Sequence, residues 1–248
     1  MIDPNKMRIA GNLVWETFQH LEPHIIEGTS TGDLNQLAHD FIISKGGYPA
    51  PLGYTMEGHP PFPKSICTSV NNIAAHGVPL DSELLINGDI ISIDISLSID
   101  GHFADACRTY PVGTIADEVE DFIDLCQITH ALLIEYVHDN LGKITTADLG
   151  AYTERLADIH GIYPIHGFGG HGIGHQLHCD PFIPPSSIQG PGVLLQPGMF
   201  ITIEPIFTMR PTAVKLAPDR WSIFAPGVLS AQFEHTLYLS PLGVEILT

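Results

Sequence analysis

The chain has 248 residues, of which 44% are hydrophobic and 15% are charged, so its composition is that of a folded protein and not of a disordered chain. Its 28 acidic residues outnumber its 10 Lys and Arg residues, which gives a net charge of -18. This excess of negative charge disfavours nucleic acid and anionic membrane surfaces as partners. Length alone allows one large domain or two small ones, and we expect residues 1–248 to form a single domain.

Nothing in the sequence predicts a membrane-spanning helix or a secretory leader. The longest apolar stretch, Gly192 to Ile203, is interrupted by Gln196 and Pro197 and is well short of the roughly 20 residues that a bilayer span needs. The first residues lack a basic leader followed by an apolar segment, so we expect a cytoplasmic protein. The four cysteines are scattered and have no CxxC spacing, so we expect reduced thiols.

Two helices are predicted at the start of the chain. Apolar residues recur at nearly helical spacing over residues 6–22 and again over residues 31–45, where Thr31 is the expected N-cap. The segment from Tyr48 to Pro63 is rich in Pro and Gly and predicts an irregular loop. A pair of strands should follow this loop.

The second part of the chain repeats this order of elements. Helical patterns cover about 116–141 and 146–160, and from Gly161 onward the sequence again predicts strands separated by Gly and Pro. Two helices followed by strands, twice over, indicate two similar halves within one α+β domain.

Residues 91–103 (ISIDISLSIDGHF) have the period of two that is typical of a strand with two different faces. The Asp-Gly pair at 100–101 favours a two-residue hairpin turn, which would place Ser96 opposite Asp105. Asp94 and Asp105 would then be diagonal neighbours on one face, with backbones roughly 7 to 8 Å apart. Two carboxylates at that separation could bind a shared cation.

Two later segments place one acidic residue each on the polar side of a strand. In MFITIEP (199–205) this residue is Glu204, and in SAQFEHTLYLS (230–240) it is Glu234, although His235 interrupts the apolar set of the second segment. A single acidic residue on a polar strand face is usually only solvated. Glu204 and Glu234 would indicate a binding site only if they lie close to other acidic residues.

The segment GFGGHGIGHQLH (167–178) contains three histidines among glycines. Histidines that cluster near acidic residues indicate a metal site, and glycine would let the backbone approach a ligand closely. A Gly-rich turn with surface histidines is the alternative, because the chain has 14 histidines in all. The spacing alone leaves both interpretations open.

Five segments together resemble the type I methionine aminopeptidases, in the same order and at nearly the same separations: PKSICTSVNNIAAHGVP, ISIDISLSIDGHFADACRTYPVG, GGHGIGHQLHCDP, LLQPGMFITIEP and SAQFEHT. The resemblance extends from about Pro63 to Thr248, and more weakly through the N-terminal helices. It implies the α+β pita-bread fold, with an antiparallel curved sheet, four flanking helices and two related halves around a dinuclear metal centre.

The resemblance also implies that two divalent metal ions are bound by five residues, Asp94, Asp105, His171, Glu204 and Glu234. Asp94 would bind one ion, and His171 and Glu204 would complete the other. Asp105 and Glu234 would bridge the two. Four carboxylates and one imidazole suit Mn, Fe, Co or Zn better than calcium, but they do not select one of these metals.

Three catalytic roles follow from the same resemblance. His178 would stabilise the oxyanion of the tetrahedral intermediate, and His76 would contact the amide nitrogen of the substrate. Glu204 would also move a proton from the nucleophilic water to the leaving amine. Beside His76 and His178, the side chain of the substrate methionine would contact Tyr54, Phe62, Cys67, Leu177 and Trp221.

Several residues depart from the pattern of the family. The segment between Tyr54 and Phe62 is several residues longer than in typical bacterial members and adds Glu57 at the mouth of the site. His175 stands where Arg is usual, Leu177 where Phe is usual, and Cys179 where an acidic residue is usual. The stretch SIFAPGVLSAQF, between Trp221 and Glu234, carries no charge. These departures concern the shape of the pocket and leave the metal-binding groups complete.

The sequence therefore predicts a metallo-aminopeptidase that removes N-terminal methionine from peptides or nascent proteins with a small second residue. One alternative is a peptidase of the same fold with Xaa-Pro or prolidase-like specificity. Such enzymes usually carry an additional N-terminal domain, for which we see no room here. Another alternative is a non-catalytic binding module, but such relatives typically lose metal ligands. We expect a monomer with weak or no affinity for ribosomes, because basic residues are few.

Overall fold

The computed structural model describes residues 2–248, and within them four α-helices occur close to the predicted positions. They are α1 (Pro4–Leu21), α2 (Thr31–Ser44), α3 (Asp117–Asp139) and α4 (Thr146–His160), with a 3-10 turn, η1 (Glu22–His24), after α1. The predicted cap of α2 was wrong by one residue. Ser30 is the N-cap, and its hydroxyl accepts from the backbone of Asp33 while the carboxylate of Asp33 accepts from the backbone of Ser30. Thr31 is the first helical residue.

The strands of the first half are β1 (Tyr48–Pro49), β2 (Cys67–Val70), β3 (Ile73–Ala75), β4 (Ile90–Ile99) and β5 (His102–Pro111). Those of the second half are β6 (Tyr163–Pro164), β7 (Gly170–Gly172), β8 (Cys179–Ile183), β9 (Phe200–Ile203), β10 (Ile206–Thr208), β11 (Lys215–Leu216), β12 (Ile223–Phe224), β13 (Ser230–Gln232), β14 (His235–Ser240) and β15 (Gly243–Ile246). All their pairings are antiparallel. The expected α+β fold with two halves of like element order is confirmed.

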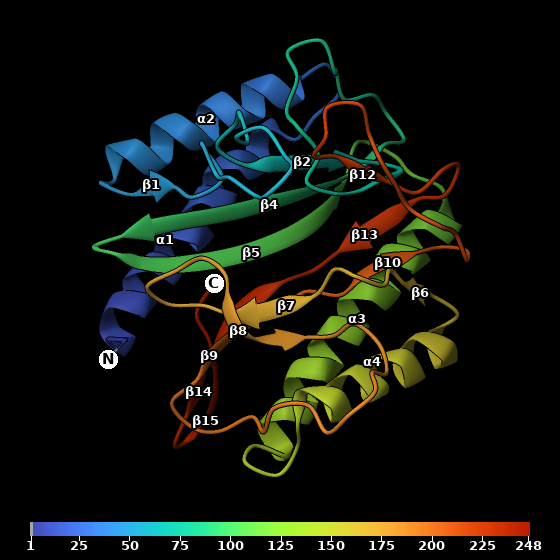
Figure 1. Ribbon diagram of the computed structural model, residues 1–248. Helices are drawn as coiled ribbons and strands as arrows, with labels where there is room; N and C mark the ends of the chain where they lie inside the picture. Colours follow the sequence, from blue (N-terminus) through green and yellow to red (C-terminus); the bar gives the residue numbers. More distant parts are fainter. Residues whose placement is uncertain (1) are drawn as a thin grey trace.

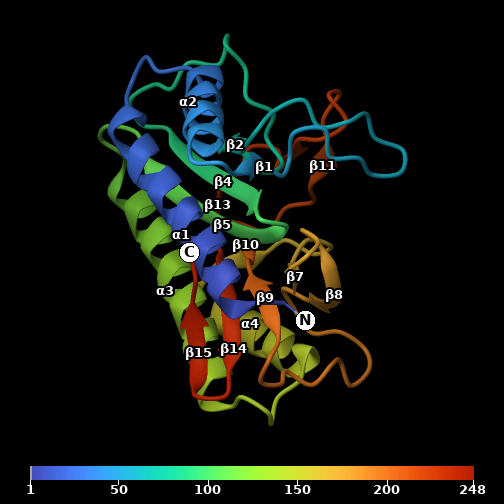
Figure 2. The same ribbon diagram turned by 90° about the vertical axis from the view of Figure 1, so that its left-hand side faces the viewer.

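Hydrogen bonding divides the strands into four sheets. One contains β1, β4, β2 and β5, and the largest has the order β15-β14-β9-β7-β8. Figure 1 shows these two sheets meeting in the middle of the molecule, one from each half. In Figure 2 helices α1 and α3 lie on one side of the strands, and β7 and β8 lie on the opposite side.

Strands β4 and β5 are buried on both of their faces. The apolar face of β4, which includes Ile91, Ile93 and Ile95, packs into the core formed with α1 and α2. The opposite face is polar, yet Ser92 is only 3% exposed and Ser96 only 5%. The polar face predicted by the period of two therefore points into the protein between the two halves, and not to solvent. This is the surface that carries the acidic residues.

The cysteines are free thiols, as predicted: Cys67, Cys107 and Cys126 are buried, and Cys179 is exposed. No helix within residues 2–248 is both long enough and apolar enough to span a membrane.

His130 on α3 provides a test of how burial affects stability. Its Nε2 lies 2.8 Å from the carbonyl oxygen of Ile203, and burial lowers the pKa of His130 to about 4. An unfolded chain would protonate this residue near pH 6.5, so folding is penalised as pH falls from 6.5 toward 4. The Gln side chain can still donate to Ile203 but does not titrate. We therefore expect His130→Gln to gain about 2 kcal/mol relative to wild type between pH 7 and pH 5.

Urea unfolding of the two metal-free proteins at both pH values measures this difference, and the comparison cancels effects that they share. The matched control is His24→Gln at an exposed position of η1. An equal gain in the control, or none in His130→Gln, would contradict the explanation.

Candidate metal centre and active site

The hairpin of β4 and β5 places the first two acidic residues. Its register pairs Ser96 with Asp105 and Asp94 with Cys107, as the Asp-Gly turn predicts. Ser96 donates a hydrogen bond of 2.7 Å from Oγ to Oδ1 of Asp105. Asp94 and Asp105 are therefore diagonal neighbours on the buried polar face.

The other three residues come from neighbouring strands of the second half. His171 lies on β7, Glu204 follows β9, and Glu234 precedes β14. Strand β9 pairs with both β7 and β14, which brings the three residues to one side of that sheet. The backbone N–H of Glu234 donates to the carbonyl of Cys107 at 2.9 Å and so connects this sheet to the hairpin.

The glycines on either side of His171 are required by close backbone packing. A Cβ on Gly170 would lie 2.2 Å from the carbonyl oxygen of Thr202, and a Cβ on Gly172 would lie 2.1 Å from that of Asp180. Any larger residue at either position would push β7 away from its neighbours. The Gly-rich pattern therefore holds His171 against the adjacent strands.

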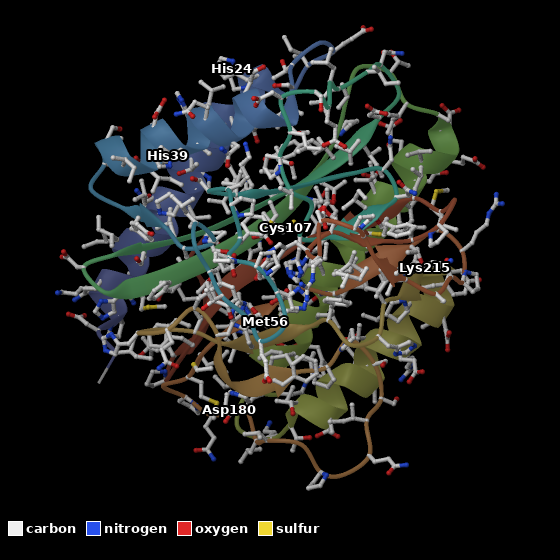
Figure 3. All side chains as sticks on the ribbon, turned by 45° about the horizontal axis from the view of Figure 1, so that its top comes forward. His24, His39, Met56, Cys107, Asp180 and Lys215 are labelled. Carbon is white, nitrogen blue, oxygen red and sulfur yellow. The ribbon has the colours of Figure 1, made fainter. Side chains whose placement is uncertain are left out.

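The five side chains converge on one small region. Nε2 of His171 lies 3.3 Å from Oε1 of Glu204 and 3.8 Å from Oδ2 of Asp105. Donor atoms of Asp94, Asp105 and Glu234 lie within 4.8 Å of one another, and so do those of His171, Glu204 and Glu234. In Figure 3 Cys107, the register partner of Asp94, lies near the centre of the molecule, whereas Asp180 and Lys215 lie toward its edges.

The electrostatics of this cluster fit bound cations. Burial raises the pKa of Asp94, Asp105 and Glu234, and it raises that of Glu204 to about 8. Oδ1 of Asp94 and Oε1 of Glu234 are buried without a hydrogen-bond partner anywhere in residues 2–248. Buried carboxylates without partners are costly unless a positive charge compensates them. Divalent ions would supply that charge.

The orientation of His171 supports the same conclusion. Its Nδ1 lies 3.0 Å from the carbonyl oxygen of Gly172, an acceptor, so the ring proton is on Nδ1. Burial lowers the pKa of His171, which keeps the ring neutral. The lone pair of Nε2 then faces the carboxylates of Asp105 and Glu204. Such an arrangement is favourable when a cation lies between them.

Two threonines and a glutamine hold the candidate ligands in place, and they were not singled out from the sequence. Thr202 donates to Oε1 of Glu204 at 2.7 Å, and Thr236 both accepts from and donates to the backbone of Asp105. Nε2 of Gln232 lies 3.5 Å from Oε2 of Glu204. All three occupy the polar side of their strands, so the same alternation that identified Glu204 could have identified them.

His178 and His76 lie beside this cluster. The ring of His178 is 4.4 Å from that of His171, and its Nδ1 lies 2.9 Å from the hydroxyl of Tyr54, a partner that the sequence did not reveal. Burial lowers the pKa of His76 to about 4. Desolvation and the neighbouring His171 also lower the pKa of His178 to about 4, although part of this residue is exposed, so both rings are neutral. A neutral imidazole still has an N–H to donate. One donor atom of His178 also lies within 4.8 Å of donors of Asp105 and His171, so the geometry permits it as a metal ligand too.

Four of the five predicted pocket residues lie together. Phe62, Cys67 and Trp221 form a buried cluster against which Tyr54 and Val78 pack. Leu177 instead belongs to a neighbouring cluster that includes Met7 and Phe200, and Tyr54 contacts both clusters. His76 lies at the edge of the first cluster, with its ring 6.4 Å from that of Trp221.

The long segment between Tyr54 and Phe62 is attached to the loop that carries Trp221. Nε1 of Trp221 donates to the carbonyl of Pro60 at 2.9 Å. Arg220 donates to the carbonyl of Gly58, and His59 contacts the carbonyl of Arg220. The segment between Tyr54 and Phe62 therefore fixes the position of Trp221 in the cluster of predicted pocket residues.

Comparison with known proteins shows the family of the chain. A model of "Metallopeptidase family M24" matches residues 5–241. The chain belongs to metallopeptidase family M24. Among its relatives, methionine aminopeptidase A of Synechocystis sp. is 40% identical over 244 residues, which cover 98% of this chain and 93% of that protein.

Solved structures share the fold over nearly the whole chain. The crystal structure of methionine aminopeptidase from Rickettsia prowazekii has a TM-score of 0.91 at 35% identity, covering 100% of this chain and 99% of that one. Prolidase from Pyrococcus furiosus has a TM-score of 0.77 at 19% identity, and its match covers 98% of this chain but 63% of the prolidase. The prolidase therefore shares the fold alone.

Proposed function

We propose that this M24 peptidase is a methionine aminopeptidase that removes N-terminal methionine from peptides or nascent proteins with a small second residue. The observation that carries the proposal is the apolar cluster of Phe62, Cys67 and Trp221 next to the carboxylates, since Cys67 is the register partner of Asp94. An unbranched thioether suits a pocket lined by such aromatic and sulfur-containing side chains. The relatives named methionine aminopeptidase, which match nearly the whole chain, support the same activity.

The cofactor proposed is a pair of divalent ions, Mn, Fe, Co or Zn, held by Asp94, Asp105, His171, Glu204 and Glu234. The two unpartnered carboxylate oxygens and the orientation of His171 support this assignment. When bound, such ions would polarise the scissile carbonyl and lower the pKa of water, so that a nucleophile forms near neutral pH.

Three side chains would handle protons and hydrogen bonds. The carboxylate of Glu204, to which Thr202 donates a hydrogen bond of 2.7 Å, is suited to accept a proton from the attacking water and pass it to the leaving amine. Neutral His178 would donate its ring N–H to the developing oxyanion, with Tyr54 orienting the ring through Nδ1. His76 would hydrogen-bond to the amide nitrogen of the substrate.

The substrate pocket proposed comprises Tyr54, Phe62, Cys67, Leu177 and Trp221. The buried cluster of Phe62, Cys67 and Trp221 supports three of these directly. Leu177 would reach the substrate only by way of Tyr54, since the two share a neighbouring cluster.

A peptide panel tests the specificity. The panel consists of Met-Ala-Ser, Ala-Pro and Met-Pro. With manganese bound, we expect Met-Ala-Ser to be cleaved and Ala-Pro to be left intact, because the proposed pocket selects a methionine side chain at the first position. Cleavage confined to the Xaa-Pro peptides would reject methionine specificity in favour of the prolidase-like alternative. If added manganese or cobalt gave no cleavage of any peptide and neither ion bound, the chain would be a non-catalytic member of the fold.

We expect weak ribosome association, because the chain has only ten Lys and Arg residues against 28 acidic ones and therefore little basic surface. The purified protein at submicromolar concentration should stay in the supernatant when ribosomes are sedimented at physiological salt. Co-sedimentation under those conditions would contradict this expectation.

We also propose that residues 1–248 form one catalytic domain and act as a monomer in the cytoplasm. Because the candidate ligands come from both halves, neither half contains the site by itself. The four free cysteines suit a reducing compartment.

A further inference from the structure

A second cavity lies away from the candidate active site. It has a volume of about 510 Å³, within the range of about 300 to 1,000 Å³ that is typical of small-molecule sites. Its walls come from η1, β5, α3 and β14, through residues that include Glu22, Arg108, Tyr110, His130, Ile134 and His235. Helix α3 and the end of α1 lie on the same side of the molecule, opposite β7 and β8 (Figure 2).

Strand β5 separates this rear cavity from the carboxylate cluster. Cys107 is the register partner of Asp94. The pKa of the Cys107 thiol is raised mainly by burial, and the negative charge of Asp94 is the second-largest cause. That thiol therefore faces the cluster. Because successive side chains of a strand point to opposite faces, Arg108 points the other way, and its guanidinium lies 4.6 Å from the ring centroid of Phe18. A ligand beside Arg108 would not touch the candidate metal ligands.

Arg108 is a half-buried cation with no anionic partner. No carboxylate oxygen within residues 2–248 lies within 4.0 Å of its guanidinium. Of the ten Lys and Arg residues, only Lys6, Arg8 and Lys45 have a carboxylate oxygen within 4.0 Å in the described part of the chain, and Arg108 is the one among the others that lines this cavity. Arginine remains protonated at every physiological pH, and its planar guanidinium matches a carboxylate in geometry.

The other polar groups of the cavity limit the charge that a ligand can carry. Arg108 is the only lysine or arginine among the described residues that line the cavity, and burial lowers the pKa of His130 to about 4. Glu22 adds a negative charge at the exposed rim, where its Oε1 accepts from the hydroxyl of Tyr110 at 3.3 Å. A singly charged anion fits this arrangement better than a phosphate.

We propose that the rear cavity binds small monocarboxylates with an apolar or aromatic body. The carboxylate would pair with the guanidinium of Arg108. The body would pack against Ile134 and Phe233, which form apolar wall beyond Arg108. None of the five candidate metal ligands lines the cavity.

The test titrates 3-phenylpropionate into the manganese-loaded protein by calorimetry, with the neutral 3-phenylpropanamide as ligand control. We expect saturable binding of the acid, and binding at least about tenfold weaker for the amide, since a charge-assisted hydrogen bond is lost. Arg108→Gln should weaken the binding of 3-phenylpropionate by a similar factor. Ala131→Phe on α3 should do the same by filling the cavity, and it leaves Arg108 in place if Arg108→Gln fails to fold.

The matched control is Ile128→Phe, which adds an aromatic ring at an exposed position of α3 outside the cavity and should bind the acid like wild type. Equal binding of the acid by wild type and both cavity variants would place it elsewhere, for example on manganese, and would overturn the proposal. Absence of saturable binding, or tighter binding of inorganic phosphate than of the acid, would overturn it as well.

Discussion

Asp105→Asn should abolish turnover and metal binding while leaving the fold intact. Asp105 belongs to two sets of residues whose donor atoms lie within 4.8 Å of one another. One set contains His171 and His178, and the other contains Asp94 and Glu234. In the variant, the amide oxygen can keep the hydrogen bond from Ser96, which leaves the NH₂ group facing the cluster. An amide nitrogen offers no lone pair to a cation. We expect the cleavage rate of Met-Ala-Ser to fall by more than about 10³-fold.

The measurement combines the cleavage rate with the manganese content of the dialysed protein and with urea unfolding. Unfolding of the metal-free variant should require at least as much urea as that of metal-free wild type, because one buried carboxylate has been removed. Asp100→Asn is the matched control, since it makes the same chemical change at the exposed hairpin turn, where Asn also tolerates the φ of 51°. Retained activity in Asp105→Asn would refute a metal-bridging role.

His178→Ala should retain bound manganese and lose about a hundredfold or more in rate, because the proposed donor to the oxyanion is removed. The loss is expected mainly in kcat, since a hydrogen bond that strengthens in the transition state affects chemistry more than binding. Tyr54→Phe removes the hydroxyl that orients His178 and should lower kcat by a smaller factor. His175→Ala, an exposed histidine of the same segment, is the control and should behave like wild type.

Metal content decides between two roles for His178. Its donor atom lies close enough to Asp105 and His171 to bind an ion with them. If the alanine variant lost manganese along with activity, His178 would be a ligand and not an oxyanion donor.

The sequence predicted the elements best where local rules act alone. The period of two in β4 and the Asp-Gly turn were sufficient to give the register of Asp94 and Asp105. The N-cap of α2 was misplaced because Ser30 and Thr31 are both good caps, and only the reciprocal bond with Asp33 distinguishes them.

Contacts between distant segments were beyond such rules. Alternation identified Glu204 and Glu234, but it could not show that their strands would face the hairpin. The support from Thr236, the contact of Tyr54 with His178 and the separate packing of Leu177 all join residues far apart in the chain. The lack of a carboxylate partner for Arg108 could not be predicted from the sequence either, because it depends on which residues surround Arg108 in space.

The hydrogen bond from the backbone N–H of Glu234 to the carbonyl of Cys107 connects the two halves at the place where both contribute candidate metal ligands. A chain that has folded only as far as β5 would contain Asp94 and Asp105, but His171, Glu204 and Glu234 would not yet be in place. Tight capture of ions must therefore wait until the last strands have docked.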